Sequence, residues 1–175
     1  NRTLEEKVKF RTRDLSLALN DISNLLHNMR QAVFTIDSTA MIMDPVSLFS
    51  KEMFHNEIVG KNVFDILYKD MDEKTEAYST LQFSLSCLFG ADDLQWELMK
   101  DFFPQKVNYI ILLDYPSHDN KELTKILRVA TNPLWDEEEK LEKIMFVVED
   151  ITELEKLEEE MKEQKESSLK NLEIL

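Results

Sequence analysis

The sequence predicts an α+β domain with five strands, flanked by two long helices. Three observations predict this class: both ends of the chain are charged and free of Gly and Pro, two strand-like runs precede a block of helical periodicity, and three further strand-like runs follow that block. Strands segregated from helices in this way favour an antiparallel sheet over the alternating order of a parallel one. A length of 175 residues suits one domain of ordinary size plus extensions.

The first expected helix covers residues 4–29. Its apolar residues recur at spacings of four and three, which is a heptad pattern interrupted only by Arg11. A helix of about 25 residues is roughly 40 Å long and buries so narrow a stripe poorly by itself. We therefore expect pairing with an identical helix, and packing back onto its own domain is the alternative. The expected seam residues are Leu4, Val8, Leu15, Ile22 and Leu25.

The middle of the chain changes from strands to helices. Residues 32–37 and 41–43 are strand-like runs separated by a small polar turn, which predicts a hairpin. Short helical periodicity follows over residues 46–60, and residues 63–103 are mostly helical in pattern. Gly90 predicts the end of one helix and the start of the next. Three further strands are expected over residues 107–115, 123–133 and 143–150, joined as antiparallel hairpins.

A second exposed helix is expected over residues 153–175. Thr152 followed by Glu155 fits a capping box, in which both side chains bind free amides of the first turn. The heptad pattern weakens after Met161, because Gln164 and Ser168 occupy positions where apolar residues are expected. The expected seam residues of this helix are Leu154, Leu157 and Met161.

The tripeptide Asp150-Ile151-Thr152, placed between the last strand and an emergent helix, resembles the end of a PAS domain. The stretches 4–8 and 11–15 are similar to the signalling helix that precedes sensor domains in bacterial membrane-bound histidine kinases. The resemblance implies a PAS-like five-stranded antiparallel sheet with helices on one face, between coiled-coil helices. It also implies three parts: an amino-terminal signalling helix over 1–29, a PAS-like sensor domain over 30–152, and an output helix over 153–175. Residues 94–104 look like an insertion relative to the PAS pattern.

Composition argues against several classes of partner. The net charge of -14 repels phosphate backbones and anionic headgroups, so neither nucleic acid nor direct membrane contact is expected. The longest apolar runs, 109–113 and 144–148, are far shorter than the roughly 20 residues of a membrane helix. A lone Cys87 fits a reducing compartment. We expect a cytoplasmic segment of a larger protein, whose parent could be anchored in the inner membrane.

No catalytic or cofactor chemistry is expected in this segment. Cys87 lies in a Ser-Cys-Leu-Phe setting, unlike the Asn-Cys-Arg setting of covalent flavin photoreceptors. The histidines His27, His55 and His118 share no metal-ligand spacing and suit neither haem nor a transition metal. Two glycines cannot build a phosphate-binding or nucleophile motif. We predict no metal, no cofactor and no catalytic residue, although the full-length parent could be a histidine kinase.

A PAS-like cup implies an apolar cavity in which a small molecule of unknown identity could bind. Strand alternation nominates most of the lining, and polar or stacking contacts complete it. Plain core packing is the alternative for every one of these residues. The candidates are Phe34, Ile36, Trp96, Ile111, Arg128, Val129, Thr131, Asn132, Phe146 and Val148.

These observations lead to a functional hypothesis with one alternative. The first is a PAS sensor or relay module of a two-component signalling protein, which forms a homodimer through its flanking helices and is covalently linked to upstream and downstream domains. In this hypothesis Asp150, Ile151 and Thr152 transmit a conformational change to the outgoing helix, with Asp150 tied to a nearby basic group. The alternative is a ligand-free dimerisation or spacer module of the same kind of protein.

Overall fold

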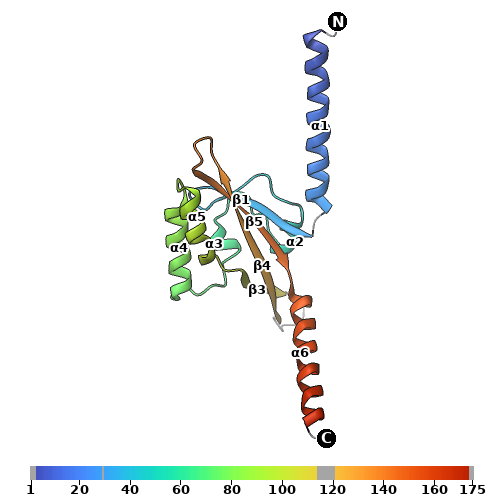
Figure 1. Ribbon diagram of the computed structural model, residues 1–175, viewed down its shortest axis with the longest axis vertical. Helices are drawn as coiled ribbons and strands as arrows, with labels where there is room; N and C mark the ends of the chain where they lie inside the picture. The colour runs from blue at the N-terminus through green and yellow to red at the C-terminus, as the bar shows by residue number, and fades with distance from the viewer. Residues whose placement is uncertain (1–2, 29, 114–120, 174–175) are drawn as a thin grey trace.

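The computed structural model describes residues 3–28, 30–113 and 121–173. A five-stranded antiparallel sheet with the order β2-β1-β5-β4-β3 lies at its centre (Figure 1). The predicted α+β class and the five strands are confirmed. The strands are β1 (Gln31–Ile36), β2 (Ile42–Met43), β3 (Lys106–Leu113), β4 (Lys121–Trp135) and β5 (Leu141–Asp150).

The helical block is more divided than its sequence pattern predicts. Residues 67–75 form turns and not helix, and side chains of Asn62, Thr75 and Asp92 each cap the helix that follows by accepting a backbone N–H. Gly90, with φ of 83°, occupies the left-handed region between two helices, as the sequence predicts. The helices are α2 (Phe49–Phe54), α3 (Val63–Ile66), α4 (Glu76–Leu88), α5 (Asp93–Met99) and the 3-10 helix η1 (Lys100–Phe102).

One face of the sheet and the helical block form a single core. Alternate residues of β1 are fully buried, and those between them are half-buried. Phe34 of β1 stacks on Phe146 of β5 with ring centroids 5.3 Å apart, and Phe103 meets Phe146 edge-on at 6.2 Å. Burying aromatic rings of this size contributes strongly to stability. The core therefore holds the strands and α2 to α5 together as one domain.

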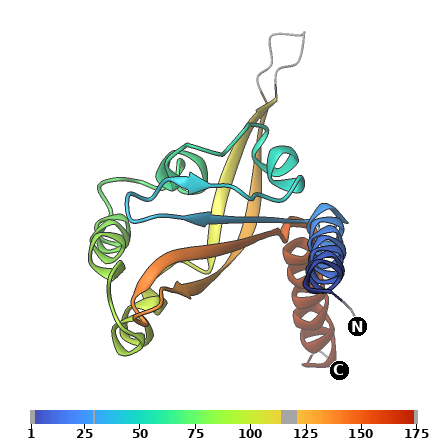
Figure 2. The same cartoon turned by 90° about the horizontal axis from the view of Figure 1, so that it is seen from above.

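The two long helices lie outside this core. Helix α1 (Leu4–Asn28) and helix α6 (Thr152–Glu173) extend from the domain in opposite directions along its longest axis, with the chain termini at the two extremes (Figure 1). Both lie on the side of the domain away from α4 and α5 (Figure 2). No helix among the described residues has the length and apolar character needed to cross a membrane.

Candidate functional site

The last strand and the outgoing helix meet at a short joint, which we define as Lys125, Ile126, Asp150, Ile151 and Thr152. Strand β5 ends at Asp150 and α6 begins at Thr152, so the buried Ile151 alone separates them. The Ile151 amide donates to the Ile126 carbonyl at 2.9 Å, and the Ile126 amide donates to the Thr152 hydroxyl at 3.0 Å. The hydroxyl thus replaces a backbone acceptor, and pairing with β4 continues into the first residue of α6.

The Asp150 carboxylate contacts both Thr152 and Lys125 within the joint. One oxygen accepts both the Thr152 amide at 3.0 Å and the Thr152 hydroxyl at 2.5 Å, while the other lies 3.6 Å from Lys125 Nζ. Asp150 therefore satisfies a free N–H of the first helical turn and places negative charge at the helix amino terminus, where it is favourable. Lys125 on β4 is therefore a basic group that faces this carboxylate.

The predicted capping box is wrong. Thr152 is the first residue of α6 and directs its hydroxyl to Asp150 and β4, because the strand leaves an unpaired amide at Ile126. Glu155 donates its amide to the Ile151 carbonyl within the helix, but its carboxylate forms an ion pair with Lys106 of β3. These two side chains therefore bind the helix to neighbouring strands. A capping box, by contrast, involves only groups of the helix's own first turn.

The charge of Asp150 is stabilised by this geometry. Burial by itself would raise the pKa of the Asp150 carboxyl, but the Thr152 hydroxyl and amide and the Lys125 ammonium together hold that pKa below its ordinary value. The carboxylate is thus ionised at neutral pH and remains an acceptor for both Thr152 groups.

Two ion pairs lie beside the joint, one between α6 and β3 and the other between β4 and β5. Lys106 of β3 binds Glu155 of α6, and Arg128 of β4 binds Glu149 of β5 at 2.6 Å. Each pair is partly exposed and so contributes little stability alone. Because Lys106 lies on β3 and Ile126 on β4, the first turn of α6 contacts two strands besides the one that leads into the helix. The direction of α6 therefore depends on how β3, β4 and β5 lie together.

The predicted pocket residues fall into three groups. Six are buried in the core: Phe34, Ile36, Trp96, Val129, Phe146 and Val148. Ile111 and Thr131 are half-buried. Arg128 and Asn132 are exposed, and as pocket contacts they are wrong, because they alternate with the inward-facing Val129 and Thr131 and so lie on the other face of β4.

One buried polar atom in the core was not singled out from the sequence. The side chain of Tyr68, which follows α3, is 1% exposed, and no described residue offers its hydroxyl a hydrogen-bond partner. Burial raises the pKa of this phenol well above its ordinary range. Buried hydroxyls are normally paired, so this atom is a candidate contact for a small polar ligand or a water molecule. The helical pattern around Tyr68 predicts that its side chain is buried, but it does not predict that its hydroxyl lacks a hydrogen-bond partner.

The expected seam residues are exposed on both long helices. Leu15 and Ile22 are 63% and 54% exposed, and Leu157 and Met161 are 57% and 65% exposed. Leu4, Val8 and Leu154 are also exposed, whereas the side chain of Leu25 lies outside the described residues. Two apolar stripes therefore face solvent in the single chain.

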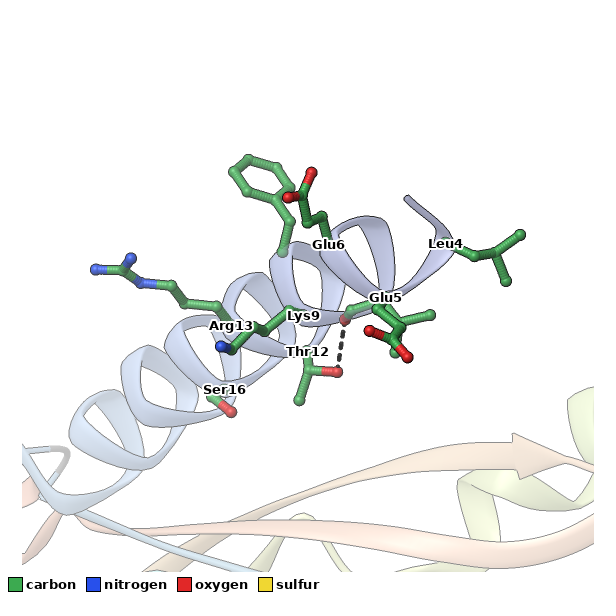
Figure 3. Close-up of a pocket in the computed structure, with 9 residues that line it drawn as sticks. Leu4, Glu5, Glu6, Lys9, Thr12, Arg13 and Ser16 are labelled. Carbon is green, nitrogen blue, oxygen red and sulfur yellow. Dashed lines mark hydrogen bonds between the residues drawn. The ribbon is translucent and has the colours of Figure 1, made fainter. Parts of the chain in front are cut away.

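A hollow along the first turns of α1 belongs to the same surface. Every residue that lines it lies on α1 itself, and the Thr12 hydroxyl is satisfied by the Val8 carbonyl at 2.8 Å (Figure 3). A single helix cannot enclose a small molecule, so the hollow reflects an unpaired helix surface. Its lining comprises Leu4, Glu5, Glu6, Val8, Lys9, Phe10, Thr12, Arg13 and Ser16.

The described residues contain no group of three His, Cys, Asp or Glu side chains placed to hold a metal ion. His55 ends α2 in a left-handed conformation, and Cys87 is an exposed free thiol. The side chain of His27 and all of His118 lie outside the described residues.

One antiparallel sheet in the order β2-β1-β5-β4-β3, lying between two long helices, agrees with the PAS-like architecture that the Asp-Ile-Thr tripeptide implied. Neither a protein-family model nor a curated protein sequence matches the chain. Among solved structures, the PAS domain of an HTR-like protein from Haloarcula marismortui is 14% identical with a TM-score of 0.48, and the match covers 82% of this chain and 99% of that one. A PAS domain from Colwellia psychrerythraea is 12% identical with a TM-score of 0.47, covering 78% and 98%. The PAS domain of Bordetella pertussis BvgS is 14% identical with a TM-score of 0.44, covering 86% and 98%. These likenesses concern the fold alone.

Proposed function

We propose that this chain is a signalling module that relays a conformational change from its sheet, through α6, to a downstream output domain. The joint and the Lys106–Glu155 ion pair support the proposal, since together they bind the start of α6 to β4 and to β3. A shift of either strand against β5 would change the direction of α6. Such a switch requires a free-energy difference of only about 1–3 kcal/mol between its two arrangements.

The relay works as a homodimer in this proposal. Exposed apolar stripes on α1 and α6 support it, because two copies that pair these stripes remove them from water. A change in direction of two paired α6 helices then becomes a rotation or a register change in the helix pair. We further propose that the output domain is a histidine kinase and that the module lies in the cytoplasm.

The stimulus could enter through the core or through the neighbouring parts of the protein. The unpartnered Tyr68 hydroxyl favours a sensor that binds a small molecule. The alternative, a ligand-free dimerisation or spacer module, is favoured by the close stacking of Phe34 on Phe146. Native mass spectrometry of the purified chain distinguishes them: a dimer of the 20.7 kDa chain with an added small mass supports the sensor, and a bare dimer supports the ligand-free module.

The relay itself is tested by removing the joint in the full-length protein. The output is measured as ATP-dependent phosphorylation. In the double variant Asp150→Ala with Thr152→Ala, this phosphorylation should no longer respond to the signal that changes it in the wild type. The matched control is Lys51→Ala, which removes an exposed ion pair with Glu57 on α2's side of the domain. Unchanged output together with reduced stability of the double variant would leave the joint with a purely structural role and contradict the relay.

A further inference from the structure

A second exposed apolar surface lies on α5, on the side of the domain away from α1 and α6 (Figures 1 and 2). Helix α5 turns Trp96 into the core, where that residue is 4% exposed, and turns Leu94 and Leu98 outward, where they are 68% and 69% exposed. Residues four apart lie on the same face of a helix. Phe102, one further step along η1, is 49% exposed. We call Leu94, Leu98 and Phe102 the α5 ridge.

Acidic side chains surround the α5 ridge. Asp92, Asp93, Glu97 and Asp101 are exposed on the same helix and its flanks. The turn between β4 and β5 brings further carboxylates beside it, because Gly90 and Ala91 exchange backbone hydrogen bonds of 2.9 Å with Leu141. Glu139 of that turn shares a hollow with Leu94 and Trp135. The acidic residues of the turn are Asp136, Glu137, Glu138 and Glu139.

This combination of an apolar ridge and an acidic rim selects one kind of occupant. The helix and the turn together carry eight exposed carboxylates and two lysines, Lys100 and Lys140. Lys100 is already paired with Glu97 at 2.7 Å. A second copy of the same surface would bring like charges together, which disfavours self-association. A helix with Leu or similar residues along one face and Lys or Arg at its borders would cover the apolar residues and neutralise the rim. Its position away from α1 and α6 leaves the ridge free when those helices pair.

We propose that the α5 ridge is a docking surface for a basic amphipathic helix of another protein. This inference goes beyond the relay and does not depend on it. The ridge would let a partner bind the domain without competing for the dimer helices. Electrostatic attraction would accelerate the encounter, and the leucines would supply most of the affinity.

The test uses a fluorescent Leu/Lys helix of about 18 residues, with leucines on one face, titrated with the whole chain and followed by anisotropy. Control peptides have the same composition in scrambled order, or Glu in place of Lys. The double variant Leu94→Ser with Leu98→Ser should weaken binding of the amphipathic peptide by about tenfold or more. Leu112→Ser, which removes an equally exposed leucine on β3, should leave binding unchanged. Asp93→Asn with Asp101→Asn should reduce both the affinity and its salt dependence.

Three results would overturn the proposal. One is binding of the amphipathic peptide no tighter than binding of the scrambled peptide. Another is equal loss of binding in Leu112→Ser and in the α5 variant. The last is self-association in analytical ultracentrifugation that the α5 variant abolishes, because it would assign the ridge to a second copy of this chain. Since both leucines are exposed, the variants should keep the circular dichroism spectrum of the folded domain.

Discussion

The domain and its two long helices bury their apolar residues to opposite degrees. Phe34 and Phe146 are completely buried between the sheet and the helical block, whereas Leu15 on α1 and Leu157 on α6 are more than half exposed. The domain therefore obtains its stability from contacts within one chain. Most helical stability in proteins comes from packing an amphipathic face, and in the proposed dimer α1 and α6 obtain that packing from a second copy. A module built in this way can keep its domain intact while the arrangement of its helices changes.

The most destructive test of this comparison is a core truncation. Phe146→Ala removes a ring that stacks on Phe34 and meets Phe103, and it should lower the free energy of unfolding by about 3–5 kcal/mol. Urea denaturation of the whole chain measures the loss. Leu169→Ala on α6 is the matched control and should change the unfolding of the domain very little, because that leucine is 61% exposed. Equal losses would show that α6 is part of the domain's folding unit.

A second test separates the dimer from the domain. Leu15→Glu with Ile22→Glu places charges in the expected seam of α1 and should raise the dimer dissociation constant by about a hundredfold, a cost of about 3 kcal/mol. Sedimentation velocity measures the constant, and the near-ultraviolet signal of the buried aromatic residues should be unchanged. Phe83→Glu, an equally exposed site on α4, is the control. Weakening of the dimer by the control alone would contradict pairing through α1.

The joint should make a smaller contribution to stability. Asp150→Ala removes the acceptor of two Thr152 groups and should cost about 1 kcal/mol, as loss of a helix cap does. Because the pKa of Asp150 is lowered in the folded chain, its contribution is present above the ordinary value of 3.8 and is lost as the pH falls through the folded value. Denaturation of wild type and variant from pH 7 downward should therefore converge in acid. A difference that grows in acid would contradict this assignment.

The smallest expected effect concerns the charge of α6. The helix contains eight glutamates and four lysines within residues 152–173, so two parallel copies repel each other. Raising the salt concentration screens that repulsion and should tighten the dimer by about threefold. Titration by sedimentation at low and high salt measures the change. Weaker association at high salt would indicate instead that opposite charges hold the helices together.

The sequence predicts which helices and strands form better than it predicts which side chains contact one another. Heptad spacing predicts α1, and alternation of apolar residues predicts β1 and β5, because both patterns reflect local geometry. Alternation also predicts the burial of Phe34, Phe146 and Val148. The pattern fails for residues 67–75, where Leu67, Tyr68 and Met71 have a helix-like spacing but the segment forms turns.

The joint could be predicted only in part. The tripeptide nominates Asp150 and Thr152, but their partners lie on other strands, and one sequence does not give the register that places Leu127 opposite Asp150. Lys125 and Ile126 follow from that register, and Lys106 follows from the position of β3. The capping box failed for the same reason: an amide of β4 competes for the Thr152 hydroxyl. Strand alternation by itself places Arg128 and Asn132 on the face opposite Val129 and Thr131, so their polarity is no sign of a pocket contact.

The most direct test of the account is a distance measurement between the sheet and α6. Spin labels at Asn132→Cys and Ser167→Cys, with Cys87→Ser and an excess of unlabelled protein to suppress signals between copies, report the direction of α6 by pulsed electron resonance. The account predicts a narrow distance distribution that broadens or shifts when Asp150, Thr152 and Glu155 are all replaced by Ala, and that stays narrow in the Lys51→Ala control. The same distribution in the wild type and the triple variant would contradict the claim that the joint sets the direction of the outgoing helix.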